Sequence, residues 1–284
     1  FNVRAVVTQP DRPTGRSRST TAPTPVKAAA TGEGLEVLQP EKPTDPAFLQ
    51  RLRDLAPDVG VVVGYGHILR KELLTLPRRG MVNVHPSLLP ALRGAAPIEW
   101  TILRGIESTG VTIMQLDEGL DSGPILHQLP HRVDPDTTAG ELRAHLAEMG
   151  AQALIEALAL WEQDGLKPVP QNDAHATYAP KLTREVAHID WTKPADVVAR
   201  QTLALDPKPG AWTIHEGREI KLFVGRALPG SGTPGEVTEA AARLVIAAGD
   251  GLVEVAEVQP AGKERMPAGD WVRGRGTAAG RRFT

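Results

Sequence analysis

The chain contains no cysteine and few aromatic residues, which make up 4% of its 284 residues. The lack of cysteine excludes disulfides, thiolate catalysis and Cys-ligated metal centres, and it fits a reducing compartment. No apolar run approaches the ~20 residues that cross a bilayer, and no basic segment followed by an apolar one is typical of a secretory leader. We therefore expect a cytoplasmic protein without a membrane partner.

The chain also lacks a large excess of charge of either sign. Its formal net charge of −2 argues against indiscriminate binding to nucleic acid, although a local basic patch is compatible with this total. One basic segment is a loop over residues 9–23, rich in Pro, Gly, Ser and Thr, which carries Arg16 and Arg18. Most such loops are simply solvated, but guanidinium groups on a loop also suit the binding of phosphates.

Polar side chains end an apolar strand predicted over residues 82–85. Because side chains alternate along a strand, Asn83 and His85 share one face. Pro86 cannot donate to a sheet ladder, so the strand ends at His85 and presents both side chains at its end. Ligands bind at this end of the strands in open α/β sheets. The segment predicts a polar site, although Asn and His are also ordinary turn residues.

A second apolar strand, predicted over residues 111–116, runs into a loop rich in carboxylates and glycines at residues 117–123. A carboxylate from this loop close to His85 would fix the tautomer of the imidazole and raise its basicity. Residues alone leave open which carboxylate does so. The combination predicts an acid–base site that needs neither a metal nor a nucleophilic side chain.

Alternation of strands and helices predicts a doubly wound α/β domain with a mostly parallel, Rossmann-like sheet over residues 1–165. The nearly continuous apolar run at residues 58–66 favours a strand buried on both faces. Further signals predict helices over residues 25–32, 46–55 and 97–103, and a long helix from the capping box at Thr138 to Gly165.

The rest of the chain differs in character. Residues 166–189 contain several prolines and no periodicity, which indicates a linker. Closely spaced strands with hairpin turns then predict a small OB-like β-barrel over residues 190–284, a fold that can bind nucleic acid. Lys208 and Lys263 are candidate RNA contacts on this barrel.

Motifs along nearly the whole chain carry a family resemblance. They lie at residues 8–13, 83–90, 93–97, 110–114, 120–123, 178–182, 189–191, 209–212 and 259–263. Together they resemble the methionyl-tRNA formyltransferases. The strand with Asn83 and His85 and the turn after it resemble the wider formyltransferase superfamily, whereas the arginine loop and the barrel-like tail resemble its tRNA-dependent branch.

The resemblance implies transfer of a formyl group from 10-formyltetrahydrofolate to the amino group of methionyl initiator tRNA. Attack of the amine on the formyl carbon gives a tetrahedral intermediate, whose oxyanion Asn83 would stabilise. His85 and Asp121 would handle the proton, and which of them is the base stays open. The folate-contacting turn is implied to contain Ser87, Leu88, Leu89 and Pro90. Arg16 matches the tRNA-binding loop, and we expect a monomer without a metal.

The family begins with a strand, a turn and a helix that would precede Phe1, so we expect an interrupted sheet and a poorly stable protein if the chain is made as written. Two alternatives remain. A sugar-nucleotide amine N-formyltransferase would use the same Asn83, His85 and Asp121. A non-catalytic RNA-binding relative would keep the fold without the activity.

Overall fold

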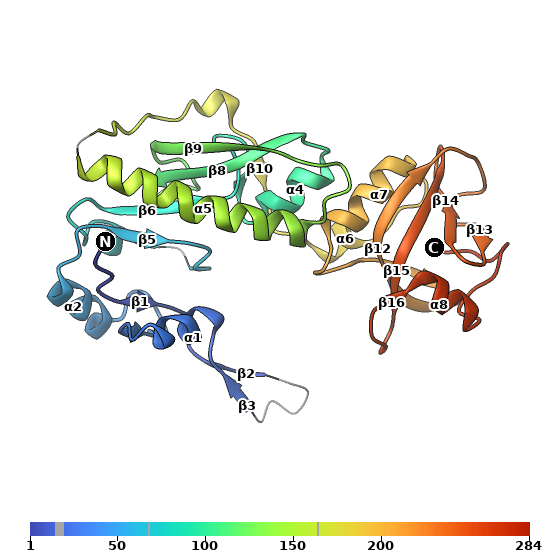
Figure 1. The fold of residues 1–284 in the computed structure, drawn as a ribbon, viewed down its shortest axis with the longest axis horizontal. Coiled ribbons are helices and arrows are strands. Elements are labelled where there is room, and N and C mark those ends of the chain that lie inside the picture. The colour runs from blue at the N-terminus through green and yellow to red at the C-terminus, as the bar shows by residue number, and fades with distance from the viewer. Residues whose placement is uncertain (15–19, 68, 164) are drawn as a thin grey trace. The chain divides into compact units, whose positions relative to one another are not determined.

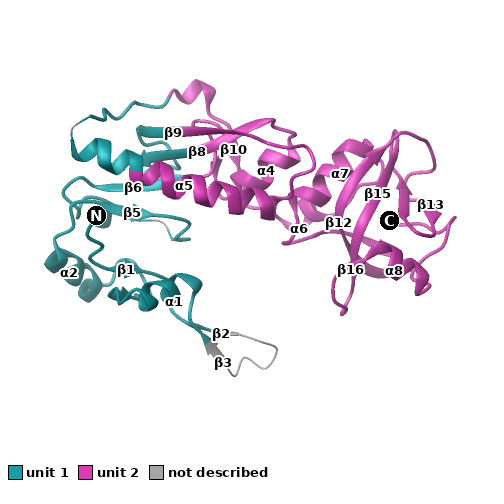
Figure 2. Cartoon of the chain, viewed as in Figure 1, with its two compact units in different colours: residues 1–85, 112–127, 156–171 teal, residues 86–111, 128–155, 172–284 magenta. Residues whose placement is uncertain are grey.

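The computed structural model describes residues 1–14, 20–67, 69–163 and 165–284. It forms two compact units (Figure 2). Unit 1 contains residues 1–85, 112–127 and 156–171, and unit 2 contains residues 86–111, 128–155 and 172–284. The domain limits expected at residues 165 and 190 stay predictions.

Unit 1 begins with a parallel pair of short strands, β1 (Val6–Val7) and β4 (Val37–Leu38). Between them the chain forms β2 (Arg12–Thr14) and β3 (Thr20–Ala22), which pair antiparallel (Figure 1). The prediction of an irregular loop throughout residues 9–23 is therefore wrong at these two stretches. Their three threonines are β-branched and favour extended backbone.

Two helices of unit 1 start as the sequence predicts. Helix α1 (Pro25–Gly32) begins after Thr24, whose side chain accepts a hydrogen bond from the Lys27 amide. Helix α2 (Pro46–Leu55) begins after Asp45, which caps the Phe48 amide in the same way. In both helices proline occupies the first turn, where its missing amide hydrogen costs nothing.

A four-stranded sheet has the order β5-β6-β8-β9, with β5 (Gly60–Val62), β6 (Met81–His85), β8 (Ser108–Gln115) and β9 (Ile125–Arg132). Strand β6 runs parallel to β5 and antiparallel to β8, so the sheet is mixed and Rossmann-like. Among the described residues, the β1–β4 pair forms a separate two-stranded sheet. The prediction that residues 58–66 are buried on both faces is wrong, because β5 is an end strand and Val61 and Val63 are exposed.

Helix α3 (Lys71–Leu74) precedes β6, and helix α5 (Ala139–Glu162) follows β9 along the chain. The capping box of α5 forms as predicted: Thr138 Oγ1 accepts from the Glu141 amide, and the Glu141 carboxylate accepts from the Thr138 amide. The predicted apolar stripe is core in part: Leu142, Leu146 and Trp161 are buried, whereas Met149, Leu154 and Leu158 are half-buried.

In unit 2, helix α4 (Pro97–Leu103) has the predicted bounds. Strand β7 (Arg93–Gly94) pairs in parallel with β10 (Tyr178–Ala179), which follows a 3₁₀ turn, η1 (Asp173–His175). The segment expected to be only a linker therefore contributes a strand.

The C-terminal part of unit 2 is one antiparallel sheet with the order β11-β12-β15-β14-β13, and β16 pairs with β15. The elements are α6 (Arg184–Ala187), α7 (Ala195–Ala204), β11 (Ala211–His215), β12 (Arg218–Leu228), β13 (Val237–Ala240), β14 (Leu244–Ala247), β15 (Leu252–Pro260), β16 (Met266–Pro267) and α8 (Ala268–Arg273). Glu216 and Gly217, both at positive φ, form the predicted hairpin turn between β11 and β12.

This sheet is not a closed barrel in its strand pairing. The C-terminal residues nevertheless reach both of its edges: the Thr284 amide donates to the Ile214 carbonyl, and the Val237 amide donates to the Arg281 carbonyl. Phe283, between them, is buried in the core with Leu222 and Ile246. Among the described residues, no helix combines the length and the apolarity that a membrane span needs.

Candidate active site

Strand β6 presents Asn83 and His85 on one face, as the alternation predicts. Asn83 pairs with Met114 and His85 pairs with Thr112 on the antiparallel neighbour β8. Cross-strand partners share a face of the sheet, so the apolar Met114 side chain and the Thr112 hydroxyl border the site. His85 is almost fully buried, whereas Asn83 is half-buried. The imidazole is therefore shielded from water, whereas Asn83 is partly exposed to it.

The loop after β8 brings one carboxylate to His85. Oδ2 of Asp121 lies 3.7 Å from Nδ1 of His85, and the two side chains are 15% and 4% exposed. Asp121 has a φ of +49°, in the left-handed region that few non-glycine residues adopt. Backbone strain of this kind persists where the surrounding structure imposes it and gathers at functional sites.

Asp117, another carboxylate of the loop, plays a different part. Asp117 accepts hydrogen bonds from the Gly119 amide and the Ser122 hydroxyl, so its charge stabilises the turn. A Cβ at Gly123 would overlap the carbonyl oxygen of Gln115, so only glycine fits there. The structure thus selects Asp121 from the carboxylates that the residues alone left open.

Gln171 holds this loop from a distant part of the chain. Its Nε2 donates to the carbonyl oxygens of Asp121, at 2.9 Å, and of Gly123, at 2.7 Å. Sequence reasoning missed Gln171, because it lies in the stretch assigned to the linker and no local pattern marks it. The two bonds fix the backbone on both sides of Ser122 and therefore the direction of the Asp121 side chain.

A tyrosine loop leaves the sheet beside Asn83. Val62 of β5 pairs in parallel with Asn83, so the segment after β5 emerges at the same edge. Within it, the Tyr65 carbonyl accepts a hydrogen bond from Nε2 of Gln9. Burial raises the pKa of Tyr65, which keeps its phenol neutral at neutral pH. The loop therefore adds a neutral phenol to this edge.

The turn expected to contact folate belongs to unit 2. Side chains hold it by hydrogen bonds to backbone carbonyl oxygens. Ser87 is buried and its hydroxyl donates to the Ala91 carbonyl at 2.6 Å, while the Leu89 carbonyl accepts from Nε2 of Gln128. The Leu89–Pro90 peptide bond is cis. The Ser87 hydroxyl thus shapes the turn. The contact of folate with Ser87, Leu88, Leu89 and Pro90 stays a prediction.

Comparison with known proteins identifies the family. A formyl transferase model matches residues 1–158, and a model of the formyl transferase C-terminal domain matches residues 181–276. The methionyl-tRNA formyltransferase of Magnetococcus marinus is 46% identical over 99% of this chain and 90% of its own length. The chain belongs to the methionyl-tRNA formyltransferase family. The methionyl-tRNA formyltransferase of Thermobifida fusca is 44% identical over 99% of this chain and 91% of its own length.

Solved structures agree in fold with this family membership. HypX from Aquifex aeolicus, in complex with tetrahydrofolic acid, has a TM-score of 0.66 at 22% identity, covering 87% of this chain and 43% of that one. WlaRD, a sugar 3N-formyl transferase, has a TM-score of 0.64 at 14% identity, covering 93% of this chain and 100% of that one. At such identities the likeness concerns the fold alone.

The RNA contacts predicted for this member of the methionyl-tRNA formyltransferase family fall in two places. Arg16 and Arg18 lie outside the described residues. Lys208 and Lys263 are exposed on two loops of unit 2. The loops are tied together by a two-pronged ion pair, in which Arg265 donates to both carboxylate oxygens of the buried Asp206 at 2.6 and 2.8 Å.

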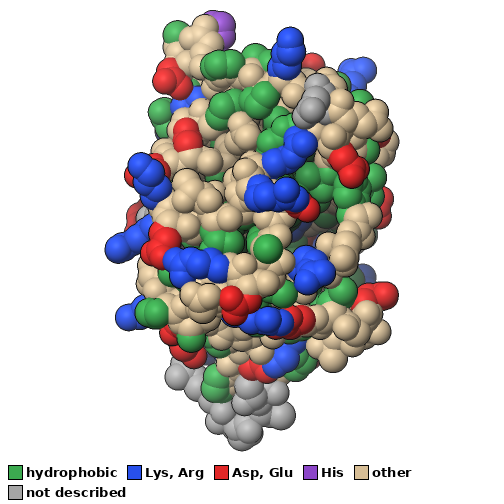
Figure 3. Space-filling model, turned by 90° about the vertical axis from the view of Figure 1, so that its left-hand side faces the viewer, with side chains coloured by type: hydrophobic (Ala, Val, Ile, Leu, Met, Phe, Trp, Pro, Cys, Tyr) green, Lys and Arg blue, Asp and Glu red, His purple; other side chains and the backbone are tan. Residues whose placement is uncertain are grey.

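On one face of the molecule, the surface charge does not by itself mark a nucleic-acid site. On the face shown in Figure 3, basic and acidic side chains are interspersed with apolar ones and form no patch of a single sign. Within the described stretches, no cluster of three or more His, Asp or Glu residues could hold a metal ion.

Proposed function

We propose that this chain transfers the formyl group of 10-formyltetrahydrofolate to the amino group of methionyl initiator tRNA, in the cytoplasm and as a monomer. The observation that carries the proposal is the Asn83, His85 and Asp121 constellation in a chain that is 46% identical to a methionyl-tRNA formyltransferase. The C-terminal antiparallel sheet, as an OB-like module, and the arginine loop would bind the tRNA.

The reaction needs a stabilised oxyanion and a path for one proton. The amine of the methionyl group attacks the formyl carbon, and the carbonyl oxygen becomes an oxyanion that the Asn83 amide stabilises by donating a hydrogen bond. The ammonium nitrogen loses a proton as the C–N10 bond of the folate breaks. His85 and Asp121, 3.7 Å apart, receive that proton and pass it to N10, which keeps the electron pair of the broken bond and leaves as the amine of tetrahydrofolate; Asp121 also orients the imidazole.

Formyl transfer to methionyl initiator tRNA by the purified chain is the direct test. Asn83→Ala should lower kcat by about 10²–10³, the usual effect of losing one oxyanion donor, and should leave tRNA affinity unchanged. Asn2→Ala is the matched control, because Asn2 is exposed and distant from β6 in sequence. Arg16→Ala should do the reverse, weakening tRNA binding while sparing kcat.

Other outcomes separate the alternatives. An unmodified chain that formylates a sugar-nucleotide amine but not the tRNA would support the sugar-amine enzyme. Binding of tRNA without any formyl transfer would support the non-catalytic relative. Full activity of Asn83→Ala would contradict the site assignment.

A further inference from the structure

A short stretch of unit 2 lies along the turn expected to contact folate. The Thr177 amide donates to the Pro90 carbonyl, and the Thr177 hydroxyl accepts from the Leu92 amide at 2.9 Å. The Ala95 amide donates to the Ala179 carbonyl at 2.9 Å. Backbone bonds on both sides of Tyr178 therefore fix it beside the end of this turn.

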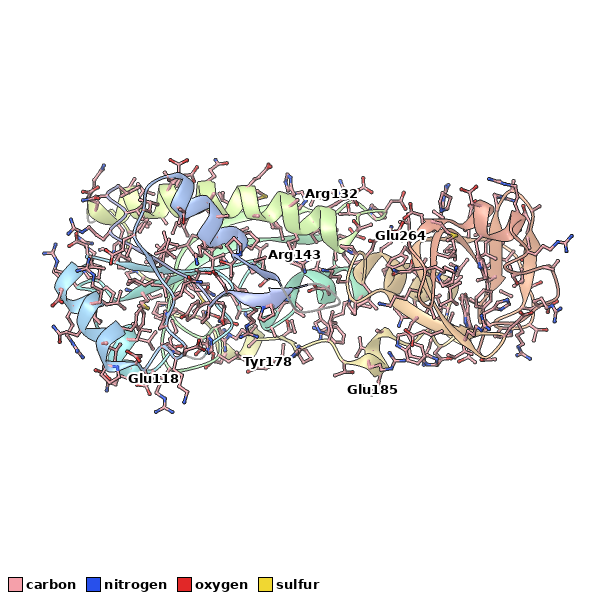
Figure 4. All side chains as sticks on the ribbon, turned by 90° about the horizontal axis from the view of Figure 1, so that it is seen from below. Glu118, Arg132, Arg143, Tyr178, Glu185 and Glu264 are labelled. Carbon is pink, nitrogen blue, oxygen red and sulfur yellow. The ribbon has the colours of Figure 1, made fainter. Side chains whose placement is uncertain are left out.

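The Tyr178 side chain is exposed although its backbone is fixed. The residue is 55% exposed, whereas the neighbouring Ala179 is fully buried. Its carbonyl oxygen accepts a hydrogen bond from Nη2 of Arg104 at 2.8 Å. In Figure 4 Tyr178 and Glu185 lie on one side of unit 2, away from Arg132. Because the backbone of Tyr178 is already fixed, little conformational entropy is lost when another flat group stacks on its ring.

Two basic residues lie close to the backbone of Tyr178: Arg104, which contacts its carbonyl oxygen, and Lys181, three residues further along the chain. The Arg104 guanidinium lies 4.8 Å from the ring centroid of Trp100, and the Trp100 indole donates to the Pro180 carbonyl at 2.7 Å. Lys181 is exposed immediately after β10. Neither Arg104 nor Lys181 forms an ion pair with a carboxylate of the described chain. An exposed aromatic ring together with nearby cations is the combination that binds single-stranded nucleic acid.

We propose that Tyr178 is a stacking platform for a nucleobase of the single-stranded 3′ end of the aminoacylated tRNA, with Arg104 and Lys181 contacting the adjacent phosphates. This inference rests on the proposed function. The 3′ end carries the methionyl group and must approach the formyl donor, and Tyr178 is held next to the turn expected to contact that donor. Stacking on a ring accepts any base, so the platform would position the strand without reading its sequence.

The test is the affinity of the full chain for uncharged initiator tRNA, either intact or lacking its last three nucleotides. Tyr178→Ala should weaken binding of the intact tRNA roughly 5- to 100-fold, the effect of losing one stacked base, and should leave the trimmed tRNA unaffected. Tyr178→Phe keeps the ring and should bind like the unmodified chain. Ile155→Ala, which truncates another exposed apolar side chain of unit 2, should change neither affinity.

Salt dependence tests the two cations separately. Arg104→Gln should reduce the slope of log affinity against log salt by about 0.7 for the intact tRNA, as expected for one lost contact to a single-stranded phosphate. The slope for the trimmed tRNA should stay the same.

Three outcomes would overturn the inference: equal weakening of both tRNAs by Tyr178→Ala, no weakening of either, or equal binding of both tRNAs by the unmodified chain. Each of these can occur in a chain that still formylates methionyl-tRNA. Failure of the proposed function would appear differently, as absence of formyl transfer by the unmodified chain.

Discussion

Nδ1 of His85 and Oδ2 of Asp121 lie 3.7 Å apart with both side chains largely shielded from water. This separation is longer than a direct hydrogen bond, and catalytic contacts commonly shorten only when substrates are bound. Because the two groups come from β6 and from the loop after β8, their approach depends on the fold of that loop.

Removing the charge of Asp121 tests its part in proton transfer. Asp121→Asn keeps the size of the side chain, and asparagine tolerates the positive φ of this position. We expect kcat to fall by about 10²–10⁴, the usual contribution of general acid–base catalysis, with little change in the free energy of unfolding. Single-turnover formylation with saturating folate measures this. An unchanged kcat would assign the proton to His85 alone.

Gln171 positions Asp121 through the backbone of the loop. Gln171→Ala removes two hydrogen-bond donors, so the loop should loosen and kcat should fall about tenfold as the alignment of the carboxylate is lost. The KM for tRNA should not change, which distinguishes positioning from general damage. The matched control is Gln50→Ala, which removes an exposed glutamine that donates a hydrogen bond to Asp54. Equal loss of activity in both variants would refute this role.

The glycine at the end of the loop has no room for a side chain. Gly123→Ala would push a Cβ into the Gln115 carbonyl oxygen, so the loop must shift and formyl transfer should be largely lost. Gly32→Ala is the opposite case, because a Cβ there meets nothing within 4 Å and the residue ends helix α1. Helix propensity predicts that it is neutral or stabilises by up to ~1 kcal/mol. Thermal unfolding and activity of both variants check this contrast.

The Asp206–Arg265 ion pair should matter more for stability than exposed pairs. Arg265→Met leaves the Asp206 carboxylate buried without its cation, which typically costs about 3–5 kcal/mol. Adding Asp206→Asn should recover part of the loss. Arg51→Met breaks the exposed Glu36 pair and should cost far less, because solvent screens exposed ion pairs. Urea unfolding measures all of these, and a cost of Arg265→Met as small as that of Arg51→Met would contradict the argument.

A pair of histidines predicts a pH dependence of stability. Burial, together with the neighbouring His145, lowers the pKa of His131, and the two ring centroids are 4.3 Å apart. The unfolded chain therefore binds more protons than the folded one as the pH falls through the ordinary histidine range near ~6.5, so the free energy of unfolding should decrease there. His145→Gln should make this decrease smaller, and the exposed His175→Gln should not. Identical pH profiles for His145→Gln and the unmodified chain would show that His145 has no such effect.

Much of the local structure could be predicted because its causes are local. Thr24, Asp45 and Thr138 cap helices through groups three residues away, and the hairpin at Glu216 and Gly217 needs only backbone freedom at the turn. The prediction of burial failed where it depends on the strands that lie beside a segment in the sheet. Strand β5 reads as a fully buried run, but burial depends on which strands lie beside it, and it has a partner on one side only.

For the candidate site, the sequence by itself determined that Asn83 and His85 share a face at the end of β6, because side-chain alternation and Pro86 fix this over five residues. Only the tertiary structure decided that Asp121 approaches His85 while Asp117 stabilises the loop, and that Gln171 holds that loop in place. These contacts join residues far apart in the chain, and their geometry depends on the pairing of β6 with β8 and on backbone hydrogen bonds that no local pattern encodes.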